Sequence, residues 1–160
     1  MTDKKQDLVV FATNRKARHD YDILETCEVG VELRGTEIKS IRQRRASLDD
    51  SFARIEGGEV ILYNMHVSPY EQGNRFNVDP VRLRRLLLHR REIDRLTGLV
   101  SQKRLTLVPL KLYARRGMAK LELAVARGKR VFEKRDRIRQ REEDRELRQH
   151  LRRSPKEPKR

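Results

Sequence analysis

The stretch Tyr21-Asp-Ile-Leu-Glu-Thr-Cys-Glu-Val-Gly-Val-Glu-Leu-Arg-Gly35 decides the fold class of this chain. Alternate positions of the stretch carry apolar side chains, at Tyr21, Ile23, Val29, Val31 and Leu33. Such a period of two is typical of a β-strand with one buried face. Gly30 lies inside the run and indicates a bulge or a tight bend. The stretch therefore predicts a bent strand in a strongly curved sheet.

Further strands are expected on both sides of this stretch. They are predicted at Leu8–Ala12, Phe52–Ile55, Val60–Tyr63, Leu105–Leu112 and Met118–Val125. The pair that flanks Gly57-Gly58 has the pattern of a hairpin, and Pro109 favours an edge or bulged strand. About six short antiparallel strands within some 125 residues favour a small closed β-barrel of the oligonucleotide-binding (OB-fold) type with inserted helices. An open α+β sheet is the alternative.

Two helices are expected between the strands. Asn14 can cap a brief helix over Arg15–Arg18. A longer helix is predicted to begin at Pro80, a residue that suits the first helical position, and to reach Leu96. Its apolar stripe would be formed by Leu83, Leu86, Leu87 and Ile93. Gly98 is a candidate interruption before a further helical turn.

Charge divides the chain into a barrel, residues 1–129, and a tail, residues 130–160. The 160 residues carry net charge +15, of which the tail has +6 and the barrel +9. Few apolar residues occur in the tail, so burial cannot offset the entropy cost of ordering it, yet Arg, Glu, Gln and Leu favour helix. We therefore expect a tail that is disordered when free and helical on a polyanion. The alternative is a solvated basic extension that only aids solubility.

Several classes of function lack support in the sequence. No apolar run approaches the roughly 20 residues that span a bilayer. The single Cys27 forms no intrachain disulfide and suits a reducing cytoplasm, where we expect the protein. The four histidines lack metal-ligand spacing, and no catalytic motif occurs, so we expect no metal, no cofactor and no enzymatic activity.

The charge instead favours nucleic acid as the partner. A basic field attracts polyanions, and small barrels often display basic and aromatic side chains on one face. Aromatic residues make up only 5% of the chain and Trp is absent. Recognition should therefore depend on phosphates and RNA shape more than on base stacking.

Four segments, in order along the chain, resemble those of the SsrA-binding protein family, also called small protein B. Asn14-Arg-Lys-Ala-Arg-His-Asp-Tyr21 and Gly35-Thr-Glu-Ile-Lys-Ser-Ile-Arg42 are two of them. The third is residues 64–96, with Ser68-Pro69-Tyr70, Asn74-Arg75-Phe76 and Asp79-Pro80 followed by the triple leucine at 86–88. The fourth, Gly128-Lys-Arg-Val-Phe-Glu-Lys-Arg135, is similar to the family's junction between barrel and tail.

The resemblance implies a function in ribosome rescue. The barrel would bind the tRNA-like domain of transfer-messenger RNA and deliver it to stalled ribosomes, and we expect a monomer when the protein is free. The tail would lie as a helix in the empty mRNA channel. The rival interpretation is a ribosome-associated structural protein that binds ribosomal RNA through the same basic barrel.

The resemblance also implies site residues. Those matched or adjacent to the family's RNA-binding surface are Asn14, Arg15, Lys16, Arg18, His19, Glu28, Leu87 and Lys120. Those expected at the decoding centre and the mRNA channel are Lys129, Phe132, Glu133, Lys134, Arg135 and Arg139. The family's junction usually has Asp where this chain has Glu133. From the residues alone, Glu28 and Lys120 suit a solvated strand face, and Leu87 suits the core equally well.

Overall fold

A computed structural model describes residues 8–129 and 131–153 of the chain. Internal contacts divide the chain into two units, Met1–Gly128 and Lys129–Arg160. In the first unit the elements in chain order are β1 (Val9–Thr13), α1 (Arg15–Asp20), β2 (Tyr21–Val31), α2 (Gly35–Arg42), β3 (Ala46–Ser47), β4 (Phe52–Glu56), β5 (Glu59–Tyr63), β6 (His66–Val67), the 3-10 helix η1 (Glu71–Phe76), β7 (Arg84–Leu87), α3 (Arg90–Lys103), β8 (Thr106–Arg115) and β9 (Met118–Gly128). The second unit contains α4 (Val131–Arg153).

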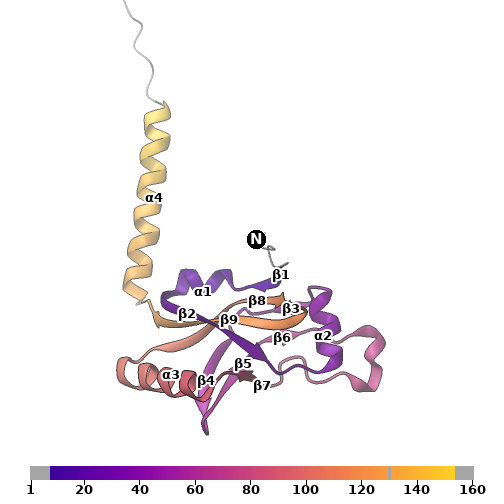
Figure 1. Cartoon of the computed structure of the whole chain (residues 1–160). Helices are drawn as coiled ribbons and strands as arrows, with labels where there is room; N and C mark the ends of the chain where they lie inside the picture. The colour runs from indigo at the N-terminus through magenta and orange to yellow at the C-terminus, as the bar shows by residue number, and fades with distance from the viewer. Residues whose placement is uncertain (1–7, 130, 154–160) are drawn as a thin grey trace, which may run out of the picture. The chain divides into compact units, whose positions relative to one another are not determined.

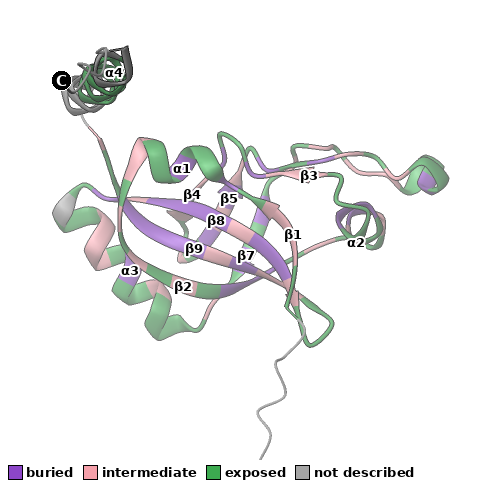
Figure 2. Ribbon diagram, turned by 90° about the horizontal axis from the view of Figure 1, so that it is seen from above, coloured by how far each residue is buried: buried purple, intermediate pink, exposed green. Residues whose placement is uncertain are grey.

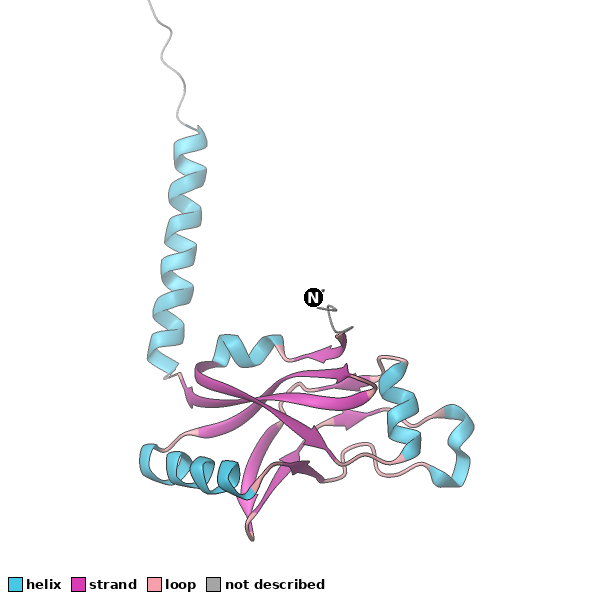
Figure 3. Cartoon of the chain, in the orientation of Figure 1, coloured by secondary structure: helices cyan, strands magenta, loops and turns pink. Residues whose placement is uncertain are grey.

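Six antiparallel strands form a closed ring, as the sequence predicts (Figure 1). The ring follows β8, β4, β5, β7, β2 and β9, and β9 pairs again with β8. The ring closes because β8 is long. One edge of β8 pairs with β9, and the other edge is shared by β4 and β1. Leu107 pairs with β4, whereas the segment from Lys111 to Ala114 pairs with β1. Figure 3 shows the helices as insertions between these strands.

The curvature of the sheet comes from local irregularities of the ladder. The register shifts between Ile23 and Glu25 in β2 and between Pro109 and Lys111 in β8. The bulge at Pro109 was expected, since proline cannot donate to the ladder. An edge position for this strand was the wrong alternative, because β8 has neighbours on both sides.

The core fills the ring. β8 and β9 are buried on both faces (Figure 2), because alternate residues face the core inside the ring while Val108, Leu110, Ala124 and Ala126 form a second cluster with Ala17 of α1. Leu62, Leu112, Leu121 and Leu123 are each 0% exposed. α3 contributes Leu96, which is 1% exposed. Apolar burial of this kind stabilises a fold by about 25 cal/mol per Å² removed from water.

The predicted helix from Pro80 to Leu96 is wrong. Residues 84–87 form strand β7 between β5 and β2, and the helix α3 begins only at Arg90 and continues through Gly98 to Lys103. The run of leucines fits the period of a helix as well as that of a strand. In the structure Leu86 is 2% exposed, while Leu83 and Leu87 are 53% and 49% exposed. This alternation is that of a strand, and ladder bonds on both edges outweigh the helix propensity of Arg and Leu.

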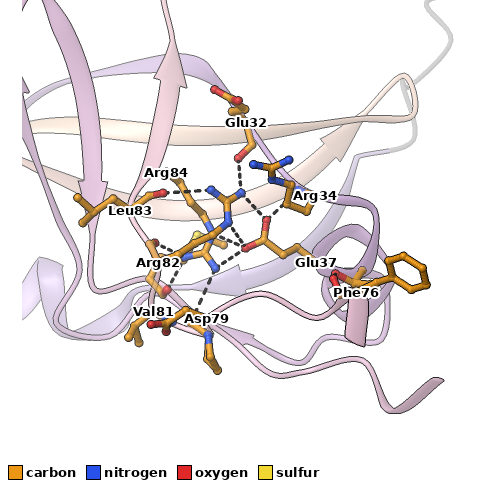
Figure 4. Close-up of polar contacts among 12 residues, drawn as sticks. Glu32, Arg34, Glu37, Phe76, Asp79, Val81, Arg82, Leu83 and Arg84 are labelled. Carbon is orange, nitrogen blue, oxygen red and sulfur yellow. Dashed lines mark hydrogen bonds and ion pairs between the residues drawn. The ribbon is translucent and has the colours of Figure 1, made fainter. Parts of the chain in front are cut away.

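A buried ion cluster holds β7 against α2 (Figure 4). Arg84 is 0% exposed and donates to Glu37 Oε1 from Nη2 at 2.6 Å and from Nε at 3.0 Å. Arg82 donates to the same carboxylate at 2.7 Å and 2.9 Å. The backbone N–H of Arg34 donates to Glu37 Oε2 at 2.8 Å, which caps α2. The cluster therefore fixes α2 beside the end of the barrel where the candidate site lies.

Candidate nucleic-acid interface

Two of the predicted site residues lie on opposite sides of Gly30 in the sheet. β2 runs between β7 and β9, and Gly30 pairs with Leu87 on one side and with Lys120 on the other. A Cβ on Gly30 would lie 3.1 Å from the Cβ of Leu87, which is tighter than an ordinary contact. The absence of a side chain at Gly30 lets Leu87 lean over β2 toward Lys120.

Leu87 belongs to the surface and not to the core. It is 49% exposed, while the adjacent Leu86 is buried. Leu87 and Lys120 line a hollow of about 430 Å³ together with Phe11 and the exposed Met118. The far wall of this hollow is α2, through Ile38 and Arg42. Apolar side chains beside a cation suit contact with a ribose or a base edge next to a phosphate.

Glu28 lies on β2 two residues before Gly30 and therefore on the same face. Its carboxylate accepts a 2.5 Å hydrogen bond from the hydroxyl of Tyr113 and a 3.1 Å bond from Nη1 of Arg115. The Tyr113 hydrogen bond, joined by those of Arg115, holds the pKa of Glu28 below its ordinary value. Burial first, and then the bond to Glu28, raise the pKa of Tyr113 well above its usual value. Glu28 thus holds two side chains in place next to Lys120.

The predicted residues of α1 form a separate group. Arg15, Lys16, Arg18 and His19 are exposed on this helix, which precedes β2. Lys16 Nζ lies 2.7 Å from Asp50, and His19 lies 3.0 Å from Asp20. Asn14 and Lys16 line one hollow with Asp50, whereas Leu87 and Lys120 line another, whose wall includes Phe11, four residues before Arg15. The structure therefore places Lys16 and the pair Leu87 and Lys120 at two different hollows.

Asn14 has an internal role in the structure. It is 3% exposed, and its Oδ1 accepts from the backbone N–H of Ala17 at 3.0 Å, which makes it the N-cap of α1 as predicted. Its amide nitrogen donates to the carbonyls of Pro109 and Leu48 at 3.0 and 3.2 Å. Asn14 thereby ties α1 to the β8 bulge and holds the basic helix in position.

The tail residues are described only in part. The backbone from Val131 to Arg153 is helical, in agreement with the predicted helix-forming capacity. Arg139 Nε lies 3.2 Å from Glu143 Oε1, an i,i+4 pair. Lys129 is half-exposed and follows β9 directly in the chain. The side chains predicted to reach the decoding centre, at Phe132, Glu133, Lys134 and Arg135, lie outside the described residues.

Two surface features were not predicted from the sequence. Phe52 and Tyr63 stack with ring centroids 5.2 Å apart, and the guanidinium of Arg54 lies over both rings. Phe76 is 68% exposed at the end of η1. The cross-strand stack follows from the register around Gly57-Gly58, which pairs Phe52 with Tyr63. The exposure of Phe76 depends on the tertiary course of a loop and has no periodic signal.

Cys27 is a free, half-buried cysteine in β2. Burial raises the pKa of the Cys27 thiol, which favours the neutral thiol over the nucleophilic thiolate. Among the described residues, no three His, Cys, Asp or Glu side chains lie close enough together to hold a metal ion. Over the same part of the chain, no helix is both long enough and apolar enough to cross a membrane.

Residues 11–153 match the family model described as SmpB protein. The chain belongs to the SsrA-binding protein family. An SsrA-binding protein of Caldicellulosiruptor saccharolyticus is 60% identical over 148 residues, which cover 92% of this chain and 94% of that protein. One of Geobacillus thermodenitrificans is 59% identical over 138 residues, covering 86% of this chain and 89% of that protein.

A solved structure gives the same assignment. It is described as "tmRNA-SmpB: a journey to the center of the bacterial ribosome" and is 56% identical in sequence, with a TM-score of 0.62. The similarity covers 74% of this chain and 84% of that chain. The sequence-based identification of the SsrA-binding protein family is therefore confirmed.

Proposed function

We propose that this protein binds the tRNA-like domain of transfer-messenger RNA and carries it to stalled ribosomes for trans-translation. The observation that carries this proposal is 60% identity to an SsrA-binding protein over nearly the whole chain. The hollow beside Leu87 and Lys120 supplies a contact surface of suitable chemistry. The protein would act in the cytoplasm, as an RNA-binding protein and not as an enzyme.

Each residue of this surface has a distinct role in the proposal. Lys120 neutralises a phosphate, and Leu87 covers the apolar edge of a ribose or base. Glu28 acts as a positioning residue, because Tyr113 and Arg115 both donate hydrogen bonds to its carboxylate. An acidic side chain that faces RNA is unfavourable in itself. The carboxylate of Glu28 instead binds and orients the guanidinium of Arg115.

The basic residues of α1 form a second contact in the proposal. Arg15, Lys16, Arg18 and His19 would meet phosphates at the other end of β2, while Asn14 holds their helix.

The tail would lie along the empty mRNA channel of the ribosome. Phe132, Glu133, Lys134 and Arg135 would reach the decoding centre, with Lys129 and Arg139 on either side. α4 has the cationic composition that such a phosphate-lined path requires.

A direct binding experiment tests the proposal. Purified full-length protein is mixed with the labelled tRNA-like domain of transfer-messenger RNA, or with a ribosomal RNA hairpin of equal length, at matched salt. We expect selective retention of the tRNA-like domain without cleavage. Equal retention of both RNAs would favour the structural ribosomal protein, and cleavage would favour an enzyme.

A charge-matched pair of variants identifies the surface. Lys120→Glu and Arg91→Glu change the net charge equally, and Arg91 is exposed on α3 and is not among the residues that line the Leu87 hollow. We expect Lys120→Glu to weaken binding to the tRNA-like domain much more than Arg91→Glu does. Equal losses would indicate that binding follows only the overall field of the protein.

A further inference from the structure

Phe76 is an aromatic side chain that a hydrogen-bonded loop exposes to solvent. Of the large apolar side chains that the structure describes, it is the most exposed, at 68%. Figure 4 shows its ring pointing away from the Glu37 cluster. A ring that serves only folding would be turned inward, since burial of a Phe side chain is worth about 1.5–3 kcal/mol.

The loop that carries Phe76 is braced from both ends. Asn77 Oδ1 accepts from the backbone N–H of Tyr70 at 2.9 Å, and Asn77 Nδ2 donates to the Tyr70 carbonyl at 2.8 Å. Gly73 fits beneath this bridge, where a Cβ would lie only 2.7 Å from Asn77 Oδ1. Thr36 of α2 donates to the carbonyl of Phe76 at 3.3 Å. Pre-organisation of this kind lowers the entropy cost of binding.

The loop also carries backbone strain next to Phe76. Asn74 has φ 45° and ψ −122°, which lies outside the favoured left-handed region. A residue held in a sparsely populated conformation costs of order 1–3 kcal/mol, and such residues cluster at binding sites.

Cations surround the exposed ring. Phe76 lines a hollow of about 460 Å³ whose other walls include Tyr70, Arg34 and Lys39. Lys39 Nζ lies 5.3 Å from the centre of the Tyr70 ring, and the Arg75 guanidinium lies 5.0 Å from that of Phe76. None of the described residues that line the hollow is a carboxylate.

The carboxylates of Glu71 and Glu37 both have arginine partners. Glu71 lies 3.3 Å from Arg45, and Glu37 is held by Arg82 and Arg84. The hollow therefore presents rings and positive charge to its occupant. This combination suits an unpaired nucleotide, whose base stacks on an aromatic face while its phosphate meets a cation.

The helix α2 connects this hollow to the proposed RNA surface. Ile38 and Arg42 line the hollow that contains Leu87 and Lys120, whereas Thr36 and Lys39 line the hollow that contains Phe76. A helix with its side chains is about 10–12 Å across, so the two hollows lie about one helix diameter apart. A single RNA can span that distance.

We propose that Phe76 stacks on an unpaired base of the same transfer-messenger RNA that contacts Leu87 and Lys120. The contact rests on the proposed function, and it adds a base-stacking anchor on the other side of α2. Arg34 and Lys39 contribute phosphate contacts beside the stacked base. Recognition of this RNA then includes one unpaired nucleotide in addition to its shape and its phosphates.

The absence of Trp from the chain makes a direct test possible. Phe76→Trp places a single indole at the proposed stacking position, and Gln102→Trp places one on an exposed position of α3 as the control. We expect addition of the tRNA-like domain to quench the emission of Phe76→Trp and to leave that of Gln102→Trp unchanged. Unchanged emission of both variants at saturating RNA would overturn the proposal.

Affinity gives a second readout. Stacking of one base contributes about 1–3 kcal/mol by alanine substitution, so Phe76→Ala should raise Kd about tenfold, whereas Phe76→Tyr should keep the parent affinity. If Phe76→Ala binds like the parent while Leu87→Ala binds more weakly, the stacking proposal fails and the proposed function stands. If the parent itself shows no selectivity for the tRNA-like domain, the proposed function fails first and the stacking proposal with it.

Discussion

Arg84 and Glu37 form an ion pair that is closed to solvent. Arg84 Nη2 lies 2.6 Å from Glu37 Oε1, and the two side chains are 0% and 3% exposed. Arg84 also donates to the carbonyls of Met65 and Pro80, at 2.6 and 3.2 Å. The pair joins β7 to α2, which separates the two hollows of the proposed RNA surface.

Glu37→Gln should destabilise the protein strongly. Removal of one partner from a buried ion pair leaves an uncompensated charge, which costs about 3–5 kcal/mol. Urea unfolding monitored by circular dichroism measures the change in the free energy of unfolding. Glu59→Gln is the matched control, because its partner Arg85 is 48% exposed and surface pairs contribute about 1 kcal/mol or less. Equal costs for the two variants would contradict the prediction.

The Glu37 carboxylate should make the free energy of unfolding depend on pH in the acidic range. Burial alone would raise the pKa of Glu37, but hydrogen bonds from Arg82 and from the backbone of Arg34, with the charge of Arg84, outweigh it and hold the pKa below its ordinary value. A pKa lower in the folded than in the unfolded state stabilises the fold above the unfolded value, about 4.3. That contribution is lost as the pH falls through the folded pKa.

The free energy of unfolding measured against pH checks this sign. From pH 6 downward, the parent should lose more stability than Glu37→Gln, because the variant has no carboxylate to protonate. The two curves should converge in acid below the ordinary Glu range. Parallel curves throughout would show that Glu37 titrates alike in the folded and unfolded states.

The barrel could be predicted from the sequence because its strands follow a local rule. The alternation from Tyr21 to Leu33 and the Gly57-Gly58 hairpin each specify a strand within a few residues. β7 could not be predicted in this way. Its four residues are specified by pairing with β5 and β2 and by the buried partner of Arg84, all distant in the sequence.

Some residues of the candidate site could be predicted from the sequence, but the contacts between them could not. The resemblance to the SsrA-binding protein family supplied Glu28, Leu87 and Lys120, and the structure places them around Gly30. It could not supply the hydrogen bond between Tyr113 and Glu28, because those residues are 85 positions apart. The exposed ring of Phe76 depends on the Asn77 bridge and the fit of Gly73, which no local pattern encodes.

Tyr113→Phe should raise the pKa of Glu28. The hydroxyl of Tyr113 is the largest cause that holds this pKa down, and phenylalanine lacks the donor. An NMR titration of the Glu28 carboxyl resonance measures the change, and Tyr70→Phe is the control because its hydroxyl contacts Gln72 instead. An unchanged Glu28 titration in Tyr113→Phe would exclude the hydrogen bond in solution.

The tail should be mobile in the free protein, although its sequence forms the helix α4. Isolated helices depend on packing for most of their stability, and every residue of 138–149 is exposed. Backbone NMR of the free protein should show narrow, poorly dispersed resonances for residues 131–153, with partial helical shifts. Broad, well-dispersed resonances with the relaxation of the barrel would show a tail packed on it.

A protein that ends at Gly128 should separate RNA binding from ribosome rescue. It retains the ring of strands and the Leu87 hollow, so it should bind the tRNA-like domain nearly as tightly as the full chain. It should fail to support tagging of nascent chains, because nothing remains to enter the mRNA channel. An in vitro translation system with a message that lacks a stop codon scores both properties.

Within the tail, the junction should matter most. Replacing Phe132, Glu133, Lys134 and Arg135 together by Ala removes a stacking ring, an acceptor and two cations but keeps a strong helix former at each position. We expect tagging to be lost and RNA binding to persist, as for the truncation. The control replaces the exposed Arg141, Glu142, Arg145 and Glu146 of α4 by Ala, which also removes charges of both signs. If the truncated protein tags normally, the tail is a solubility extension and its proposed path through the channel is wrong.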